Sequence, residues 1–481
     1  MKQEKIKRRP YLWEALISFG FLIVIMGISL GIYGSDPHVP LLIGTAFSSI
    51  MALRLGFSWT EIEESMKQGI YQALQAVIIL TIIGVLVGVW IEAGVVPAMI
   101  YYGLSIISPS VYLPVTMIIC SITSLATGTS WGTVGTVGIA MIGIASGLGI
   151  PLPIAAGAIL SGAYFGDKLS PLSDTTNLAP AVSGTDVFTH IKYMVPVTSI
   201  SFIISIILFF IVGLGYDSGT TNLETISIIQ NGIKEMFNIT PILLISPIAV
   251  IVAIALKVPA IPGISLGILL GILEAFFIQG SNFGAILSAS YYGFVSETGI
   301  AVVDNLFTTG GITNMMYAIS LTFISMMFGG IMETTGQLEV IVNTVIKRLK
   351  TASQLIAATM ITCVFSNMTM PEQVISIVVP GRMYAPAYRK MGIHPKSLSA
   401  ALEASGTMSS SLIPWTACAV YMSTTLGVPT IEYIPWTFFL YITPILTLLL
   451  SKTKLVVVEI GDDPSTVVEI LSNVQENLVE A

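Results

Sequence analysis

The sequence predicts an all-α polytopic membrane protein built from two inverted five-span repeats, each with a re-entrant hairpin and a broken transmembrane helix. Three observations support this prediction: the composition, the placement of the basic residues and a weak internal repeat. Of the 481 residues, 54% are hydrophobic and only 10% are charged, whereas about 25% are charged in typical soluble domains. The mean hydropathy of +0.87 fits a chain surrounded mostly by lipid, and we expect no nucleic-acid partner.

Ten apolar stretches are long enough to cross the bilayer. The first of them runs to about Tyr33 with no small-residue cleavage site after it, so we interpret it as a span and not as a cleaved signal. The ten stretches begin near Glu14, Pro40, Tyr71, Pro153, Tyr193, Ile239, Ile261, Asn314, Ser397 and Pro435. Residues 1–13 and the acidic tail 452–481 are then expected to be solvated ends of the chain.

The basic residues predict which side of the membrane each loop faces, because lysine and arginine in short loops mark the cytoplasmic side. Neither occurs in residues 69–167, 258–346 or 397–451. With ten crossings and a cytoplasmic N-terminus, every basic cluster falls inside, and Lys234 is the exposed exception. Lys168 falls within a span. We therefore expect a multi-pass protein of the bacterial inner membrane with both termini in the cytoplasm.

Two further apolar segments, about 111–140 and 354–381, are expected to be re-entrant hairpins. Basic clusters lie before and after 354–381, and a hairpin keeps both on the cytoplasmic side. The centre of this segment is polar and is broken by Pro371. Such backbone is tolerated at membrane depth only inside protein or beside a cavity. The alternative is an ordinary kinked helix with an offset topology.

Residues 70–215 and 312–450 resemble each other weakly, with equivalent motifs 241–244 positions apart. Five crossings precede the second unit, so the two units should be upside down relative to each other. The expected division is repeat one at 14–215 with a broken helix at about 153–190, an external linker at 216–238, and repeat two at 239–451 with a broken helix at about 397–428. Inverted repeats with polar interruptions are typical of secondary transporters, whose sites lie where the broken helices meet.

The first repeat carries the richer set of polar residues at its interruptions. A hard cation such as sodium needs oxygen ligands, and hydroxyls, carboxylates and freed carbonyls supply them here. The expected ion- and proton-binding residues are Thr129, Ser130, Asp167, Ser173, Asp174, Thr175, Thr176 and Asn177. We expect sodium in the region of Thr129, Ser173 and Asp174.

Asp174 is the carboxylate that we expect to carry the exchange. A charged group costs about 2.5–3.5 kcal/mol at the centre of a membrane helix on insertion scales, so Asp167, Lys168 and Asp174 should have a function. Lys168 is expected to tune the carboxylates; the structural alternative is that it neutralises Asp167 and holds the helix break. If the stretch were continuous helix, both carboxylates would project from one face. A carboxylate that holds either a proton or a sodium ion couples the two flows.

The second repeat offers a less acidic set of candidates, because Asp174 aligns with Ala417. These candidates are Asn367, Thr369, Glu372, Glu403, Ser410 and Ser411. We interpret Glu333, near a span end, as an interfacial or paired structural charge. The three histidines, His38, His190 and His394, are expected in loops or at span ends as surface residues, not as proton relays.

Two motifs resemble the NhaC family of bacterial sodium/proton antiporters. They are GTSWGTVGTVG at residues 128–138 and GAYFGDKLSPLSDTTN at residues 162–177. The resemblance covers about residues 12–450. It implies two inverted units, each with a scaffold and a hairpin-bearing transport part, usually in a homodimer that works as an elevator. It also implies sodium and protons as the transported species, with no cofactor.

Other functions remain as alternatives. The same family includes an exchanger of malate with protons for lactate with sodium, so small carboxylates are possible partners beside sodium, protons and the lipid bilayer. No arginine falls at any of the four tips, which disfavours a carboxylate bound by a guanidinium fork, although helix N-termini can bind anions. A channel would need a continuous polar path. We do not expect an enzyme, because the sequence has no HExxH metal motif and its histidines fall in loops.

Overall fold

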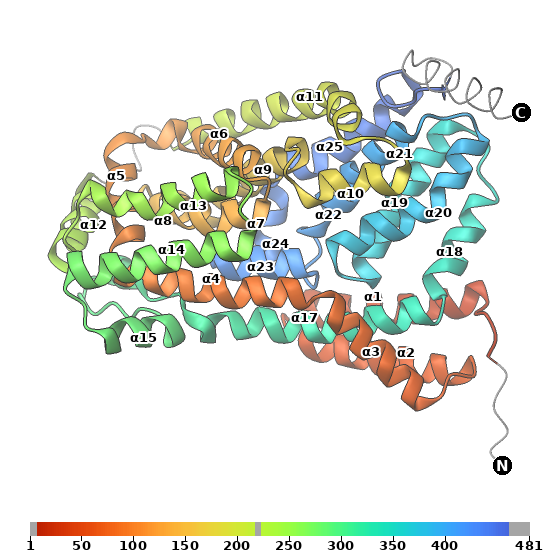
Figure 1. Cartoon of the computed structure of the whole chain (residues 1–481), viewed down its shortest axis with the longest axis horizontal. Coiled ribbons are helices and arrows are strands. Elements are labelled where there is room, and N and C mark those ends of the chain that lie inside the picture. Colours follow the sequence, from red (N-terminus) through yellow and green to blue (C-terminus); the bar gives the residue numbers. More distant parts are fainter. Residues whose placement is uncertain (1–6, 217–222, 461–481) are drawn as a thin grey trace, which may run out of the picture.

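The computed structural model describes residues 7–216 and 223–460, and within these ranges it is helical, with two isolated β-bridges. The helices of the first half are α1 (Leu12–Gly31), α2 (His38–Arg54), α3 (Trp59–Gln72), α4 (Leu74–Glu92), α5 (Val95–Ile106), α6 (Pro109–Thr127), α7 (Ser130–Thr133), α8 (Ile139–Gly147), α9 (Leu152–Leu169), α10 (Asp174–Ser183) and α11 (Val187–Leu214). Those of the second half are α12 (Leu223–Met236), α13 (Ile245–Ala255), α14 (Ala260–Glu274), α15 (Phe283–Tyr292), α16 (Ala301–Phe307), α17 (Gly311–Thr334), α18 (Gln337–Ile346), α19 (Ala352–Thr369), α20 (Gln373–Lys390), α21 (Pro395–Leu402), α22 (Met408–Ser410), α23 (Ala417–Leu426), α24 (Thr430–Tyr433) and α25 (Phe438–Leu449). Most of the long helices run along the long axis of the molecule (Figure 1).

The lengths and composition of the helices confirm a multi-pass membrane protein. Six described helices are long and apolar enough to cross a membrane, or up to eight if two bent helix pairs each count as one span. The six are Leu12–Gly31, Leu74–Glu92, Pro109–Thr127, Val187–Leu214, Ala260–Gln279 and Gly311–Thr334. The other expected crossings fall on shorter or interrupted helices, such as α2, which has 17 residues.

The first expected hairpin folds back on itself. Helix α6 ends at Gly128, which has a φ of +70°, and the chain returns through α7 and α8. The Tyr112 hydroxyl near the start of α6 donates a 2.6 Å hydrogen bond to the carbonyl of Met141 in α8. This bond joins residues on opposite sides of the turn, so the two arms are antiparallel and Gly128 lies at the tip.

The second expected hairpin consists of α19 and α20, with its tip at Met370–Glu372. The hydroxyls of Thr362 and Tyr384 are 2.9 Å apart. One turn further from the tip, the hydroxyls of Thr359 and Tyr388 are 3.2 Å apart. These pairs hold the two arms antiparallel. Figure 1 shows this hairpin in the right half of the molecule, whereas α6 and α8 lie in the left half.

Both expected broken helices are interrupted. The first stops at Leu169 and resumes as α10 at Asp174. The second runs from α21 through a π-helical turn, Glu403–Thr407, and α22, and resumes as α23 at Ala417. Because α10 starts a new helix, Asp167 and Asp174 do not share the face of one continuous helix.

Small residues let each broken helix lie directly on its hairpin. On α9, a Cβ added at Gly166 would stand 2.4 Å from the backbone nitrogen of Leu125 in α6. The Ser124 hydroxyl of α6 donates a 2.6 Å hydrogen bond to the carbonyl of Ala163 on α9. In the second half, the Ser405 hydroxyl donates a 2.5 Å bond to the carbonyl of Met360 on α19. Each broken helix is thus fixed directly to its own hairpin.

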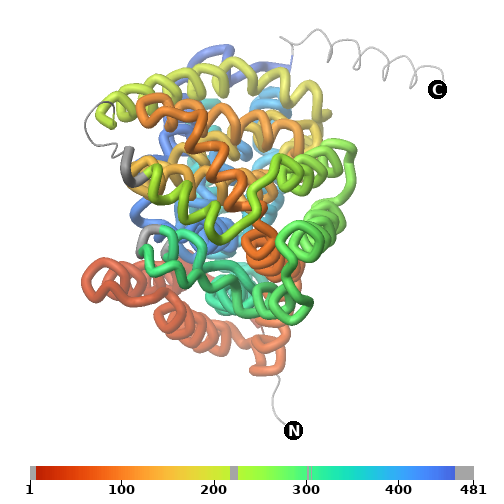
Figure 2. The backbone as a smooth tube through the Cα atoms, turned by 90° about the vertical axis from the view of Figure 1, so that its left-hand side faces the viewer, coloured from red at the N-terminus to blue at the C-terminus, as the bar shows by residue number. Residues whose placement is uncertain are grey.

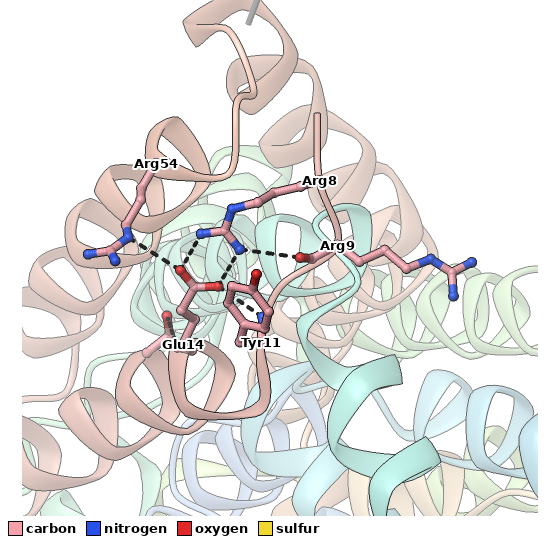
Figure 3. A network of polar contacts seen from close by, with 6 residues as sticks. Arg8, Arg9, Tyr11, Glu14 and Arg54 are labelled. Carbon is pink, nitrogen blue, oxygen red and sulfur yellow. Dashed lines mark hydrogen bonds and ion pairs between the residues drawn. The ribbon is translucent and has the colours of Figure 1, made fainter. Parts of the chain in front are cut away.

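On one side of the molecule, helices α2 and α3 pack against α17, and α1 packs against α2 and α18 (Figure 2). Their cytoplasmic end, as the sequence predicts it, is fixed by Glu14, whose side chain is fully buried at the start of α1. The Arg8 guanidinium donates two hydrogen bonds to this carboxylate, at 2.5 and 2.7 Å, and Arg54 of α2 lies 3.3 Å away (Figure 3). This cluster ties the first described residues to α1 and α2.

The expected external linker is more ordered than a simple connection. Residues 223–236 form α12, on which Ile229 and Ile233 are fully buried. The end of the expected acidic tail, residues 461–481, lies outside the described part of the chain.

Candidate functional site

A cavity of about 850 Å³ lies where the first hairpin tip, the break between α9 and α10, and the start of α20 meet. Its walls come from segments 127–131, 171–175 and 372–375, together with Asp167. Exposed residues also line it, namely Gln72, Lys257, Glu333 and Arg382. Gln72 and Glu333 lie at the ends of α3 and α17, Lys257 follows α13, and Arg382 lies in the middle of α20.

Asp167 is the buried carboxylate of this cavity. It lies in the last turn of α9, its side chain is 5% exposed, and Ser130 donates a 2.7 Å hydrogen bond to its Oδ2 atom. Ser130 is the first residue of α7, directly after the hairpin tip. The fold therefore joins an acid and a hydroxyl 37 residues apart. A charge-assisted bond of this kind is among the stronger polar contacts in proteins.

Asp174 has a different environment from the one that its expected role would require. It is the first residue of α10 and its side chain is exposed towards the cavity. Ser173 caps this helix, accepting from the backbone N–H of Thr176 at 3.5 Å, and its hydroxyl lies 3.1 Å from that of Thr175. Ser173 and Thr175 also line the cavity. Hydroxyl oxygens thus surround the break, and the buried negative charge nearest to them is Asp167.

The remaining first-repeat candidates have structural contacts. Thr176 donates to the carbonyls of Asp167 and Lys168 at 3.0 and 3.2 Å, and so closes the end of α9. The Asn177 amide donates to the carbonyls of Pro171 and Ser173, which fixes the shape of the break. Neither Thr176 nor Asn177 lines the cavity.

Thr129 lines the cavity from the hairpin tip. Its hydroxyl accepts from the backbone N–H of Gly132 at 3.2 Å and caps α7. The same segment, Gly128 to Gly132, has the G-x-S-x-G spacing of serine hydrolases. Ser130, however, donates to a carboxylate, and no hydrogen bond to a histidine is seen for it among the described residues. The spacing therefore does not represent a nucleophile–base pair here.

Of the second-repeat candidates, only Glu372 lines the cavity. It is half-buried and caps α20, accepting from the backbone N–H of Val374 at 2.6 Å. The others lie elsewhere in the protein interior. They are Asn367, Thr369, Glu403, Ser410 and Ser411. Glu372 and the exposed Glu333 add acidic groups from the second half of the chain to the cavity wall, beside Asp167 and Asp174 of the first half.

Two of the predicted charges are buried away from the cavity. Lys168 is 2% exposed and Glu403 is fully buried. Within the described residues, neither the Lys168 ammonium nor the two Glu403 carboxyl oxygens have a hydrogen-bond partner. Lys168 therefore does not neutralise Asp167 through an ion pair in this state.

Two of the histidines are not where the sequence placed them. His190 is fully buried and forms a 2.5 Å hydrogen bond with the Ser399 hydroxyl, so its prediction as a surface residue was wrong. His394 is 7% exposed and caps α21. Both lie at a helix start, His190 in the first turns of α11 and His394 at the N-cap of α21, which looks like a surface position until α11 and α21 pack against each other.

Sequence reasoning also missed several contacts at the cavity and beside it. The Trp131 and Tyr421 rings stack at 4.2 Å with an interplanar angle of 6°. The Tyr421 hydroxyl donates a 2.7 Å bond to the Trp131 carbonyl, which joins the first hairpin to α23 of the second half. Gln72 donates to Glu333 at 3.1 Å on the cavity wall. Arg382 belongs to the basic cluster that follows 354–381, which we used only to predict the topology, although this residue too lines the cavity.

The described residues contain no group of three or more histidine, cysteine, aspartate or glutamate side chains that could hold a metal ion. The cavity instead offers one buried carboxylate and several neutral hydroxyls. Such a ligand set suits a weakly bound hard monovalent cation better than a resident transition metal. A multi-pass helical protein with interrupted helices around an open, acid-bearing cavity is a membrane transporter in its architecture.

Comparison with known proteins identifies the group more narrowly. The chain matches the model of the Na+/H+ antiporter family over residues 13–163 and 162–454, and it belongs to that family. It is 37% identical over 435 residues to the "Na(+)/H(+) antiporter NhaC" of Alkalihalophilus pseudofirmus, covering 90% of this chain and 94% of the relative. It is 39% identical over 430 residues to the "Malate-2H(+)/Na(+)-lactate antiporter" of Bacillus subtilis, covering 89% and 92%.

A third relative is the "Arginine/ornithine antiporter ArcD" of Halobacterium salinarum, 35% identical over 451 residues and covering 93% of each chain. Among solved structures, the chain matches that of Neisseria gonorrhoeae MtrF, described as illuminating a class of antimetabolite efflux pumps. That match has 15% identity and a TM-score of 0.37, and covers 92% of this chain and 95% of the other. A score this low supports no structural argument.

Proposed function

We propose that this protein exchanges sodium ions for protons across the cell membrane, and that Asp167 is the carboxylate that both ions share. The observation that carries this assignment is the burial of Asp167 at the wall of an open cavity, hydrogen-bonded to Ser130. Relatives covering about nine-tenths of the chain are named as sodium/proton antiporters, which supports the reaction itself.

The arrangement couples the two flows by competition. A protonated Asp167 is neutral and has no charge with which to hold sodium. An ionised Asp167 gains from sodium the compensation that a buried carboxylate needs. Thr129, Ser130, Ser173 and Thr175 line the same cavity and supply oxygens that replace part of the hydration shell of the ion. Exchange follows if only the loaded, neutral states change their orientation.

We assign Asp174 and Glu372 to the entrance of this site. Both line the cavity and are less buried than Asp167, so water screens their charge. They raise the local concentration of cations without holding one tightly. This revises the expectation that Asp174 itself carries the exchange.

The cavity of this state faces the cytoplasm in our proposal, because Lys257 and Arg382 line it and basic residues mark that side. The two units are then inverted repeats whose hairpins enter from opposite sides, as Figure 1 suggests by their positions in opposite halves. We further propose that the termini are cytoplasmic and that the protein is a homodimer of the elevator type.

Proton movement in everted membrane vesicles tests the reaction. Adding sodium to acid-loaded vesicles should release protons, and the same vesicles without this protein should not respond. Lithium and potassium test the selectivity of the site. If sodium at saturating concentration moved no protons in vesicles that contain the folded protein, the proposal would be rejected.

A second candidate function is exchange of a small carboxylate together with these ions. It is favoured by the cavity volume of about 850 Å³, far larger than one sodium ion needs, and by Arg382 and Lys257 on its wall. A guanidinium and an ammonium are the groups that hold a carboxylate. Lactate or malate added to the same vesicles should then change proton movement, and Arg382→Gln should abolish that change but spare the response to sodium alone.

A further inference from the structure

We propose that Glu372 makes the cavity selective for cations, because its carboxylate occupies an anion-binding position that the second hairpin would otherwise offer to a small carboxylate ligand. The inference rests on the proposed sodium/proton exchange and names a residue that determines which ions the site accepts. It also separates the two candidate functions, since exchange of a small carboxylate needs the position that Glu372 fills.

The anion-binding position is the start of α20, an 18-residue helix that begins at the wall of the cavity. The first N–H groups of a helix have no partner within the helix, and together with the helix dipole they attract negative charge. Glu372 precedes the helix, and its carboxylate accepts from the backbone N–H groups of Val374 at 2.6 Å and Ile375 at 3.3 Å. The protein thus carries its own anion at the place where a bound anion would lie.

A glutamate is not needed merely to cap α20. Three other helices, α7, α10 and α23, start at the interruptions, and each is capped by a hydroxyl, from Thr129, Ser173 and Thr416 respectively. Serine and threonine, with aspartate and asparagine, are the usual residues at this position. Of these four helix starts, α20 alone has a glutamate, so its negative charge needs an explanation other than capping.

A second, independent observation is an unused hydrogen-bond donor beside Glu372. Gln373 is 7% exposed and lines the cavity. Its side-chain oxygen accepts from the Cys418 thiol, 2.9 Å away, and its amide nitrogen has no hydrogen-bond partner among the described residues. A buried donor without a partner costs stability, and a ligand that accepts a hydrogen bond in this cavity removes that cost. A carboxylate is such a ligand, whereas a sodium ion cannot accept a hydrogen bond.

A further group that attracts anions lies along the same helix. Val374, Val378 and Arg382 all line the cavity and are four residues apart, so they share one face of α20. Arg382 then lies about 12 Å from Val374 along the helix axis, at about 1.5 Å per residue. A guanidinium binds carboxylates well. An anion that Arg382 attracts therefore meets the Glu372 carboxylate at the other end of this wall.

Glu372 excludes such an anion in two ways. Its carboxylate is tethered beside the N–H groups of α20, so a free carboxylate must compete with an intramolecular one, whose effective concentration is on the order of millimolar or higher. Its charge also repels a second anion. Sodium meets neither obstacle, because a carboxylate attracts it. A neutral residue at position 372 should therefore admit a small carboxylate to the cavity.

The test measures binding of radiolabelled lactate to the purified, detergent-solubilised protein by equilibrium dialysis. Glu372→Ser keeps a hydroxyl cap but removes the charge, and its dissociation constant for lactate should be at least about tenfold lower than that of the wild type. Glu372→Asp keeps both a good cap and the charge, so it should exclude lactate as the wild type does. A purely structural role of Glu372 as a cap would not separate these two variants.

Glu333→Ser is the matched control for the loss of charge. Glu333 lines the same cavity, but it is bonded to the Gln72 side chain and not to a helix start. Its replacement should change the lactate affinity by less than about threefold, since water and salt screen an exposed charge. Adding Gln373→Met to Glu372→Ser should reverse most of the gain in affinity, because it removes the unused donor.

Equal lactate affinity in the wild type and in Glu372→Ser overturns this inference, and so does an equal gain in Glu333→Ser. If Glu372→Ser does not fold, Glu372→Asn is a second neutral cap and must show the gain. Sodium-driven proton movement is measured on the same wild-type protein. If the folded wild type moves no protons, the proposed function itself fails, which is a different result from any change in lactate affinity.

Discussion

Replacing Asp167 by asparagine tests the central assignment most directly. The change keeps the shape of the side chain and a partner for the Ser130 hydroxyl, but it removes the charge and the exchangeable proton. Asp174→Asn is the matched control, since it makes the same chemical change on the same cavity at an exposed position. The two variants differ mainly in the burial of the charge that is lost.

The burial of each carboxylate determines how much sodium affinity its replacement should cost. Two unit charges about 4 Å apart interact by about 4 kcal/mol at an effective dielectric constant of about 20, and by about 1 kcal/mol in bulk water. The value for the partly buried environment applies to Asp167, and the value for water applies to Asp174. Each 1.4 kcal/mol is about a factor of ten in affinity. Asp167→Asn should thus weaken sodium binding roughly a thousandfold, and Asp174→Asn only about fivefold.

Sodium binding by the purified, detergent-solubilised protein gives the affinities, and size-exclusion chromatography shows that each variant is folded. In the wild type, the apparent dissociation constant for sodium should also rise about tenfold for each unit by which the pH falls below the pKa of the shared carboxylate. Near-normal sodium affinity in Asp167→Asn, together with a large loss in Asp174→Asn, would refute the reasoning and restore Asp174 as the exchanging group. A wild-type affinity that does not depend on pH would exclude competition at one carboxylate.

Three further predictions concern the fold. Ser105 and Thr351 are both exposed. A cysteine introduced at Ser105 should react with an impermeant reagent from outside, and one introduced at Thr351 only from inside. Labelling of both from the same side contradicts the inverted arrangement. Gly128→Ala should abolish exchange, because the φ of Gly128 is +70° and the new Cβ would lie 2.6 Å from the α9–α10 break. Gly149→Ala, with the same φ and open space around it, should cost only about 1–2 kcal/mol of stability. Equal exchange activity of the two variants contradicts this prediction. Glu14→Gln should lower the midpoint of thermal unfolding, because it removes the charge-assisted bonds to Arg8 and Arg54, each type worth about 1.5–3 kcal/mol of stability. The exchange rate per folded molecule should stay the same. An altered sodium affinity would contradict a purely structural role for Glu14.

The positions of the interruptions could be predicted from the sequence, because they depend on local chemistry. Glycine, proline and hydroxyl residues between apolar runs break a membrane helix wherever they cluster. The breaks at Gly128, at 170–173, at 370–372 and at 411–416 all lie within the segments where we expected them. The way in which each broken helix lies on its hairpin also has a local cause, since Gly166 allows close contact with α6.

The roles of the individual acids could not be predicted in the same way. Asp167 and Asp174 lie in one motif and have equal claims to a site by composition. What separates them is the restart of the helix at Asp174, which turns that side chain towards the cavity and leaves Asp167 inside the last turn of α9. The capping by Ser173 that fixes this restart depends on the backbone geometry of the break, which no spacing rule gives.

Lys168 and Glu403 show a stronger limit on what the sequence alone can predict, and they show the physical reason for that limit. They lie in different halves of the chain, and they come near each other only because α9 and the second broken helix pack together in the folded chain. A sequence pattern records pairs that are near in the chain, such as Asp167 and Lys168, and neutralisation of one by the other was the structural alternative to a tuning role for Lys168. The fold instead leaves the Lys168 ammonium without a hydrogen-bond partner among the described residues and buries an equally unpartnered acid in the opposite half. Burying polar groups without hydrogen-bond partners costs stability, and proteins keep such costs mainly at functional sites. The unpaired state of these two groups is therefore a stronger argument for a function than a formed ion pair between them would be.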